Sequence, residues 1–100
     1  NSKGSPSDFP HLEGYAVDTV DATRIAIAHG LGSCNAPIVN TVMSGAFLKV
    51  SRLARLESLA AAIRNEVPKG VEANIAASGE AYREIEVSRL GTAAGEGLDA

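Results

Sequence analysis

The residues best suited to nucleophilic chemistry are the single cysteine, Cys34, and the two histidines, His11 and His29. A cysteine nucleophile needs a base within hydrogen-bonding reach, and the spacing along the chain does not establish that contact. Structural roles account for both sites, because Cys34 lies in a glycine-rich loop and a cationic His29 at a helix end would interact favourably with the helix dipole. A small thiol enzyme that uses Cys34 is therefore the least favoured interpretation.

The segment HGLGSC, at residues 29–34, superficially resembles a loop that holds phosphate. It lacks the Lys-Ser/Thr ending of the P-loop, and it follows a predicted helix rather than a strand, so the dinucleotide-binding context is also missing. The histidines and dispersed carboxylates show no metal-ligand spacing, and one cysteine cannot build a disulfide, a Cys-rich zinc site or a four-thiolate cluster. We predict no catalytic residue and no metal site on this chain.

Polar residues interrupt the apolar segment NTVMSGAFL, at residues 40–48. Asn40 and Thr41 precede Ser44 by four and three residues, so the three share one narrow strip of a helix. Gly45 costs about 1 kcal/mol relative to Ala in a helix interior unless another backbone comes close. We expect the strip to hydrogen-bond to an adjacent loop or subunit, with bridging by Asn40 inside its own domain as the alternative. The residues predicted to lie at an interface or in close packing are Asn40, Met43, Ser44, Gly45 and Tyr82.

One short strand is predicted to come before the helices, at residues 14–20, where GYAVDTV alternates in character and is rich in β-prone side chains. Because no second strand follows, its neighbours are expected elsewhere, upstream of this segment. The first helix follows Asp21 as N-cap and stops at Gly30. The second is expected to be capped by Asn35, to hold Pro37 in its first turn, and to run to about Val50.

Apolar residues surround most of the circumference of this second helix, which is typical of a helix enclosed on several sides. The third helix is predicted at residues 56–67, ending before Pro68. The fourth begins near Val71 and continues to about residue 87, with Glu80 and Arg83 expected to form an exposed ion pair. Residues 1–13 are expected to be a linker or surface loop, residues 14–87 the ordered domain, and residues 88–100 a flexible tail.

Composition excludes several classes of protein. The net charge is −3 and the nine Lys and Arg residues are scattered rather than gathered on one stripe, which disfavours nucleic-acid binding. No segment approaches the roughly 20 apolar residues of a membrane span, and the N-terminus lacks the order of a signal peptide. A single cysteine fits a reducing compartment, so we expect a cytoplasmic protein. The chain starts without Met, which suggests a fragment or a processed chain.

The core must be built from Ala, Val, Leu and Ile, because only 4% of the residues are aromatic and there is no Trp. A chain of 100 residues forms one domain at most. Its size leaves much apolar surface poorly covered, so burial against a partner is expected.

Three segments resemble a known family: NTVMSGAFL at residues 40–48, LESLAAAI at residues 56–63 and NIAASGEAY at residues 74–82. In this order and spacing they resemble the C-terminal half of the gamma subunit or domain of the 2-oxoacid:ferredoxin oxidoreductases, which act on pyruvate, 2-oxoisovalerate or indolepyruvate. The likeness covers about Gly14 to Tyr82. The sequence departs from the family at Arg55, where a hydroxyl residue is common, and near Pro37, where a basic residue is common.

The resemblance implies an α/β fold, namely the C-terminal portion of a Rossmann-like three-layer gamma domain with one short strand and about four helices. It implies a structural subunit of a complex in which thiamine diphosphate and magnesium sit between alpha and beta subunits, iron-sulfur clusters pass electrons to ferredoxin, and coenzyme A takes the acyl group. The implied partners are the alpha, beta and ferredoxin-like delta subunits. No cofactor ligand of the family carries over to a residue of this chain. The alternative is a non-enzymatic helical docking module, which the small-residue core and flexible ends would suit.

Overall fold

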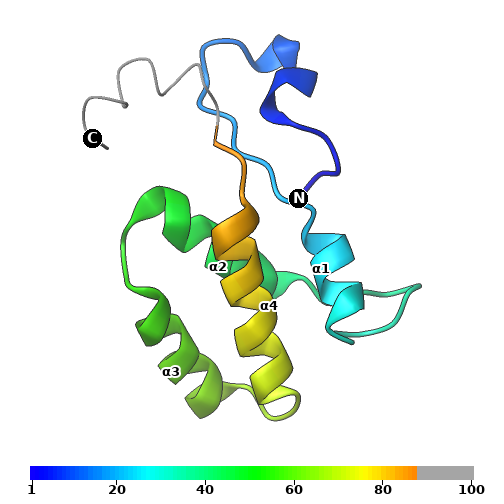
Figure 1. Ribbon diagram of the computed structural model, residues 1–100, viewed down its shortest axis with the longest axis vertical. Helices are drawn as coiled ribbons and strands as arrows, with labels where there is room; N and C mark the ends of the chain where they lie inside the picture. The colour runs from blue at the N-terminus through cyan, green and yellow to red at the C-terminus, as the bar shows by residue number, and fades with distance from the viewer. Residues whose placement is uncertain (88–100) are drawn as a thin grey trace.

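The computed structural model, which describes residues 1–87, contains four α-helices (Figure 1). They are α1 (Ala22–Ala28), α2 (Asn40–Ser51), α3 (Leu56–Glu66) and α4 (Val71–Glu84). The longest helix, α4, lies in the middle of the view, with α1 on one side, α3 on the other and α2 crossing behind it (Figure 1). The prediction of four helices is confirmed, whereas the α/β class is not, because the described residues form no sheet.

The strand predicted at residues 14–20 is not formed. Within residues 1–87, Thr19 is the one residue of this segment that pairs with another extended residue, Glu86, through an isolated antiparallel bridge. The Thr19 amide donates to the Glu86 carbonyl at 2.9 Å, and the Glu86 amide donates back at 2.8 Å. A strand needs a partner that runs beside it for several residues. Because α4 ends at Glu84, the described chain offers residues 14–20 very little extended backbone.

The start and stop of α1 agree with the prediction. The Asp21 side chain accepts a hydrogen bond from the Arg24 amide at 3.0 Å, as an N-cap should. The helix ends before Gly30, whose φ of +71° lies in the left-handed region that glycine adopts without steric cost. Before the helix, the Asn1 side chain bonds to Thr23 and the Ser2 amide donates to the Val20 carbonyl, so the first residues lie against the start of α1.

The predicted start of the second helix is wrong, because α2 begins at Asn40 rather than after Asn35. Pro37 instead forms an isolated bridge with Gly32. Ser33 and Ala36 close the intervening turn with reciprocal backbone hydrogen bonds of 3.2 and 3.1 Å. This small turn between extended residues satisfies backbone groups that a longer helix would otherwise have used.

The other two helices keep close to their predicted ranges. α3 ends at Glu66, two residues before Pro68, and α4 begins at Val71. Residues 1–13 lie on the surface and include two single-turn 3-10 helices, Pro6–Asp8 and Pro10–Leu12. The flexible tail predicted at residues 88–100 lies outside the described residues. Among residues 1–87, no helix has both the length and the hydropathy that crossing a bilayer requires.

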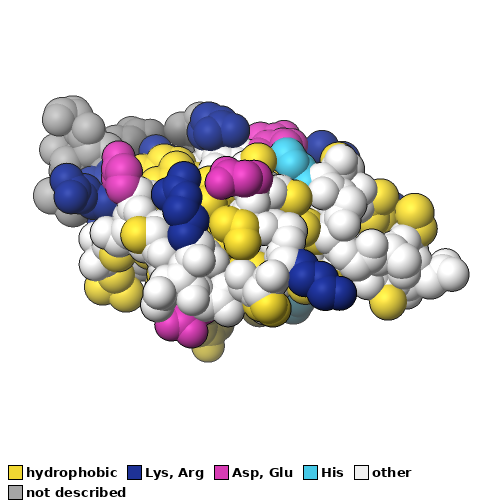
Figure 2. All heavy atoms as spheres, turned by 90° about the horizontal axis from the view of Figure 1, so that it is seen from below, with side chains coloured by type: hydrophobic (Ala, Val, Ile, Leu, Met, Phe, Trp, Pro, Cys, Tyr) yellow, Lys and Arg dark blue, Asp and Glu magenta, His cyan; other side chains and the backbone are white. Residues whose placement is uncertain are grey.

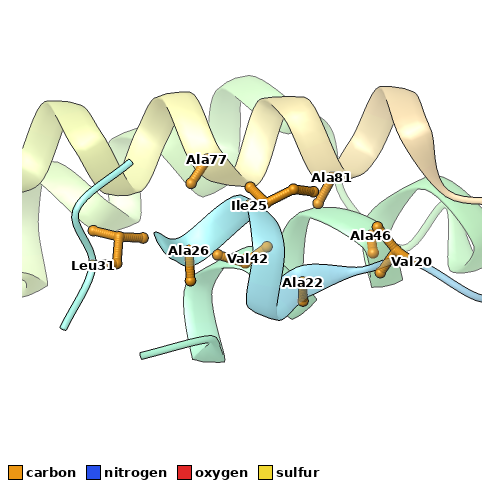
Figure 3. Packing of buried hydrophobic residues seen from close by; sticks show 9 residues of the cluster. All are labelled: Val20, Ala22, Ile25, Ala26, Leu31, Val42, Ala46, Ala77 and Ala81. Carbon is orange, nitrogen blue, oxygen red and sulfur yellow. The ribbon is translucent and has the colours of Figure 1, made fainter. Parts of the chain in front are cut away.

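The main core lies where α1, α2 and α4 meet, and it is made of small aliphatic side chains (Figure 3). α2 packs more extensively against α4 than against any other element. Alanine on both helices lets their axes approach closely, so that few large side chains are needed to fill the space between them. The composition of this core agrees with the prediction. Its members are Val20, Ala22, Ile25, Ala26, Leu31, Val42, Ala46, Ala77 and Ala81.

Candidate interface on helix α2

Helix α2 has two sides with different surroundings. Val42, Gly45 and Ala46 are buried against the rest of the chain. The other side carries residues at spacings of three and four, which therefore form one stripe along the helix. Its members are Asn40, Met43, Ser44, Phe47 and Leu48. The chain thus buries one side of α2 and covers the other only in part: Asn40 and Phe47 are exposed, whereas Met43 is half-buried and packs against the core.

Gly45 lies directly against the backbone of α4. A β-carbon built on it would meet the Ser78 carbonyl oxygen, and it would lie 2.6 Å from the Ser78 carbonyl carbon and 2.8 Å from its Cα. Carbon atoms in ordinary contact are about 3.5–4.0 Å apart. Glycine at this position therefore allows an approach between α2 and α4 that no other residue would permit.

Two polar contacts flank this approach. The Thr41 hydroxyl donates to the Asn74 amide oxygen, and the Asn74 nitrogen donates to the Gly70 carbonyl at 2.8 Å. Near the other end of α2, the Lys49 ammonium lies 5.2 Å from the centre of the Tyr82 ring. The structure therefore places Tyr82, like Gly45, in contacts between α2 and α4.

Asn40 and Ser44 form hydrogen bonds inside their own helix. The Ser44 hydroxyl donates to the Asn40 carbonyl at 3.0 Å, and the Asn40 side chain accepts from the Thr41 amide at 2.9 Å. These bonds correspond to the alternative interpretation, in which Asn40 bridges within its own domain. Both residues, together with Met43, belong to the open stripe.

The open stripe and the neighbouring part of α3 enclose a shallow groove of about 630 Å3, which we call the α2–α3 groove. Phe47 on its wall keeps 55% of its surface exposed. Phe47, Leu48 and Leu59 were not predicted as members of this site. Phe47 and Leu48 follow Ser44 by three and four residues, so their place on the same stripe of the helix could have been found from the sequence. The side of the molecule shown in Figure 2 also bears apolar side chains between charged ones. The residues lining the groove are Asn40, Met43, Ser44, Phe47, Leu48, Ala54, Ser58, Leu59 and Ala62.

A cluster of charged residues joins α1 to α4. Arg24 contacts both carboxylate oxygens of Glu84 at 3.0 Å and one oxygen of Glu80 at 3.5 Å, while His29 Nε2 lies 2.8 Å from Glu80. The hydrogen-bonding influence of Glu84 and of His29, followed by the charges of His29 and Arg24, lowers the pKa of Glu80 to about 2. The predicted pairing of Glu80 with Arg83 is wrong, because Glu80 pairs across to α1 instead.

A histidine held by a carboxylate can serve as a catalytic base if a nucleophile lies beside it. His29 and Glu80 border a hollow between α3 and α4, which Ser78 also lines. The Ser78 hydroxyl, however, is buried and donates to the Ile75 carbonyl at 2.9 Å. The contact between His29 and Glu80 links the C-terminal end of α1 to α4.

Comparison with known proteins identifies the family. The model of the pyruvate ferredoxin/flavodoxin oxidoreductase family matches residues 2–84, which is most of the chain. The chain belongs to this family. The resemblance carried by the three sequence segments is thereby confirmed.

One curated relative of the oxidoreductase family is the pyruvate synthase subunit PorC of Methanothermobacter thermautotrophicus. It is 44% identical over 75 residues, which cover 74% of this chain and 39% of PorC. The match thus spans about two fifths of the length of that relative. No solved structure shows a significant match to the chain.

The cofactors implied by the oxidoreductase family find no ligand set in the described residues. No group of three or more His, Cys, Asp or Glu side chains within residues 1–87 lies close enough together to hold a metal ion. Cys34, the single cysteine of the chain, is exposed, and one thiolate does not hold an iron-sulfur cluster. The described residues thus offer no ligand set for a metal ion or an iron-sulfur cluster.

Proposed function

We propose that this chain is a gamma subunit, or a part of one, in a thiamine diphosphate-dependent 2-oxoacid:ferredoxin oxidoreductase, and that its role is structural. The complex would decarboxylate a 2-oxoacid oxidatively, pass the acyl group to coenzyme A and deliver the electrons to ferredoxin or another acceptor. The observation that carries the proposal is the family match over residues 2–84, together with the 44% identity to a pyruvate synthase subunit.

Two structural features support a role in assembly. The α2–α3 groove brings the exposed Phe47 together with the half-buried Met43, Leu48 and Leu59. Exposed apolar groups that lie together are typical of protein interfaces. In addition, residues 14–20 have strand-like composition, and within residues 1–87 their one β-bridge is that of Thr19. A neighbouring strand supplied from outside the described residues would complete the Rossmann-like gamma domain that the resemblance implies.

In this proposal the reaction takes place on companion subunits. Thiamine diphosphate, magnesium and the iron-sulfur clusters would be held by the alpha, beta and ferredoxin-like delta subunits. Within residues 1–87, no group of His, Cys, Asp or Glu side chains could hold a metal ion. The chain would stabilise that assembly and would contact neither the 2-oxoacid nor the electrons in transit. The complex would be cytoplasmic.

Co-purification tests the proposal. The chain, carrying an affinity tag, is expressed with candidate alpha, beta and delta subunits from the same genome. The captured complex is analysed for its subunits, thiamine diphosphate and iron. We expect all subunits at fixed stoichiometry and activity with coenzyme A and a 2-oxoacid. Capture of the chain without any thiamine-dependent or iron-sulfur subunit would contradict the proposal.

Light scattering after size exclusion separates this proposal from the alternative docking module. A subunit that depends on its neighbours should aggregate or unfold easily in isolation, since its apolar stripe is uncovered. A stable monomer that does not bind the oxidoreductase subunits would instead favour an independent module.

A third measurement tests the thiol-enzyme interpretation of Cys34. We expect the Cys34→Ser variant to keep its activity, whereas loss of turnover would support a thiol enzyme.

A further inference from the structure

The hollow between α3 and α4, which His29 borders at the end of α1, has the form of a small-molecule site. We call it the α3–α4 hollow, and its volume is about 430 Å3. Leu56 and Ala60 of α3 line it, as do Ile75 and Ala76 of α4. Ligand sites of this size are typically concave and apolar, with a few polar groups that fix the orientation of the ligand. The aliphatic lining therefore suits a ligand with a short aliphatic chain.

Arg83 supplies a cation to the α3–α4 hollow. Its Nη1 lies beside Gly79, where a β-carbon would come within 3.2 Å of it, so glycine leaves room for the guanidinium against α4. Within residues 1–87, the Arg83 guanidinium forms no ion pair or hydrogen bond. A planar guanidinium matches a carboxylate in shape and in hydrogen-bonding geometry. Arg83 is therefore available to a carboxylate of a ligand.

Glu57 supplies an anion to the same hollow from α3. It is exposed and has no ion-pair partner among the described residues, and Arg83 is not close enough to pair with it. Glu80 also lines the hollow, but Arg24 and His29 already hold its carboxylate. The hollow thus presents one cation and one anion, on neighbouring helices, that the described part of the chain leaves unpaired.

We propose that the α3–α4 hollow binds a free amino acid with an aliphatic side chain. The carboxylate of the ligand would pair with Arg83, its ammonium group with Glu57, and its side chain would lie on Leu56 and Ile75. A ligand with a single charge would leave one of the two protein charges unpaired, and a ligand without an aliphatic chain would leave the apolar lining uncovered. The proposal does not depend on the proposed function, because every contact is made by this chain.

Saturation-transfer difference NMR with L-leucine tests the proposal. The full chain is used, together with its companion subunits if it purifies with them. A ligand of this size should bind with a Kd of about 1 mM. Arg83→Gln and Glu57→Gln should each raise the Kd by about fivefold or more, because each removes one charged partner. The matched controls, Arg64→Gln and Glu72→Gln, remove exposed charges that do not line the hollow and should change the Kd by less than about twofold.

Two analogues of leucine test each charge separately on the unmodified chain. Isocaproate lacks the ammonium group and isoamylamine lacks the carboxylate, so both should bind more weakly than leucine. The affinity for isocaproate should fall in Arg83→Gln and stay the same in Glu57→Gln, whereas isoamylamine should show the reverse. Circular dichroism checks that the variants retain their helices, and neither side chain lies in the core.

Three results would overturn the proposal. The first is the absence of saturation transfer to leucine at concentrations up to about 20 mM, well above the expected Kd. The second is equal affinity for leucine and isocaproate, which would assign the hollow to a simple carboxylate. The third is leucine binding that neither Arg83→Gln nor Glu57→Gln weakens, which would place the ligand elsewhere.

Discussion

Replacement of Gly45 by Ala tests the close approach of α2 and α4. The added methyl group would meet the Ser78 carbonyl and would lie 2.6 Å from its carbon atom, so the helices must separate by about 1 Å to restore an ordinary contact. Separation would loosen the contacts of Val42, Ala46 and Ala77 in the core. Because the opposing atoms belong to the helix backbone, no side-chain rotation can relieve the collision.

Two free-energy terms of opposite sign decide the result. Overpacking costs about 1–3 kcal/mol, with the upper end expected against a rigid backbone. The higher helix propensity of Ala offsets this loss of stability by about 1 kcal/mol. The net effect should be a loss of about 2 kcal/mol in the free energy of unfolding. For a domain of this size, that loss corresponds to a melting temperature lower by about 8–16 °C.

Gly79 provides a matched control on the partner helix. A β-carbon there would meet only Arg83 Nη1, at 3.2 Å, and a guanidinium at the end of a flexible side chain can move away. Gly79→Ala should therefore leave stability unchanged or raise it by up to about 1 kcal/mol. Thermal unfolding followed by circular dichroism compares both variants with the unmodified chain, alone and in the complex. A Gly45→Ala melting temperature equal to or above the original would refute the close-approach argument.

Further predictions concern the contacts around α1 and α4. The pKa of Glu80 is lowered to about 2 in the folded chain and is about 4.3 in an unfolded one, so its stabilisation is complete above about pH 5 and is lost as the pH falls towards 2. In urea unfolding, Glu80→Gln should lower the free energy of unfolding by roughly 1 kcal/mol at pH 7, because solvent screens these charges, and should leave it almost unchanged near pH 2. A difference between variant and unmodified chain that stays the same at both pH values would contradict this. Asp21→Ala should lower stability by about 1 kcal/mol through loss of the N-cap, with Asp21→Asn as the control that keeps it. Thr41→Val should cost about 1–3 kcal/mol because the Asn74 oxygen loses its donor, and an unchanged urea midpoint would refute that role.

The helices could be predicted from the sequence because their signals are local. Asp21, Gly30 and Pro68 mark helix ends through properties of single residues, and the structure places the ends of α1 and α3 beside them. The start of α2 could not be predicted in the same way. Asn35 and Pro37 fit a helix start in isolation, but the Gly32–Pro37 bridge competes for the same backbone, and that bridge depends on residues on both sides of the turn.

The strand was mispredicted for a different physical reason. β-prone side chains at residues 14–20 describe a preference for extended backbone, and a strand forms only where a second backbone satisfies its hydrogen bonds. The described residues supply that partner at Glu86 alone. Side-chain pairing across long sequence distances was equally invisible: Glu80 lies three residues from Arg83 on its own helix, yet it pairs with His29 on α1.

The location of the candidate interface could be only half predicted, because α2 is apolar around most of its circumference. A pattern of that kind says that every side needs a neighbour, but it does not say which neighbour belongs to the same chain. One side of α2 faces α4, since the Ser78 backbone leaves no space for a side chain at Gly45. The remaining side keeps Phe47 exposed. A helix that is apolar on both sides but covered on one keeps an open side on which a neighbour would bury apolar surface.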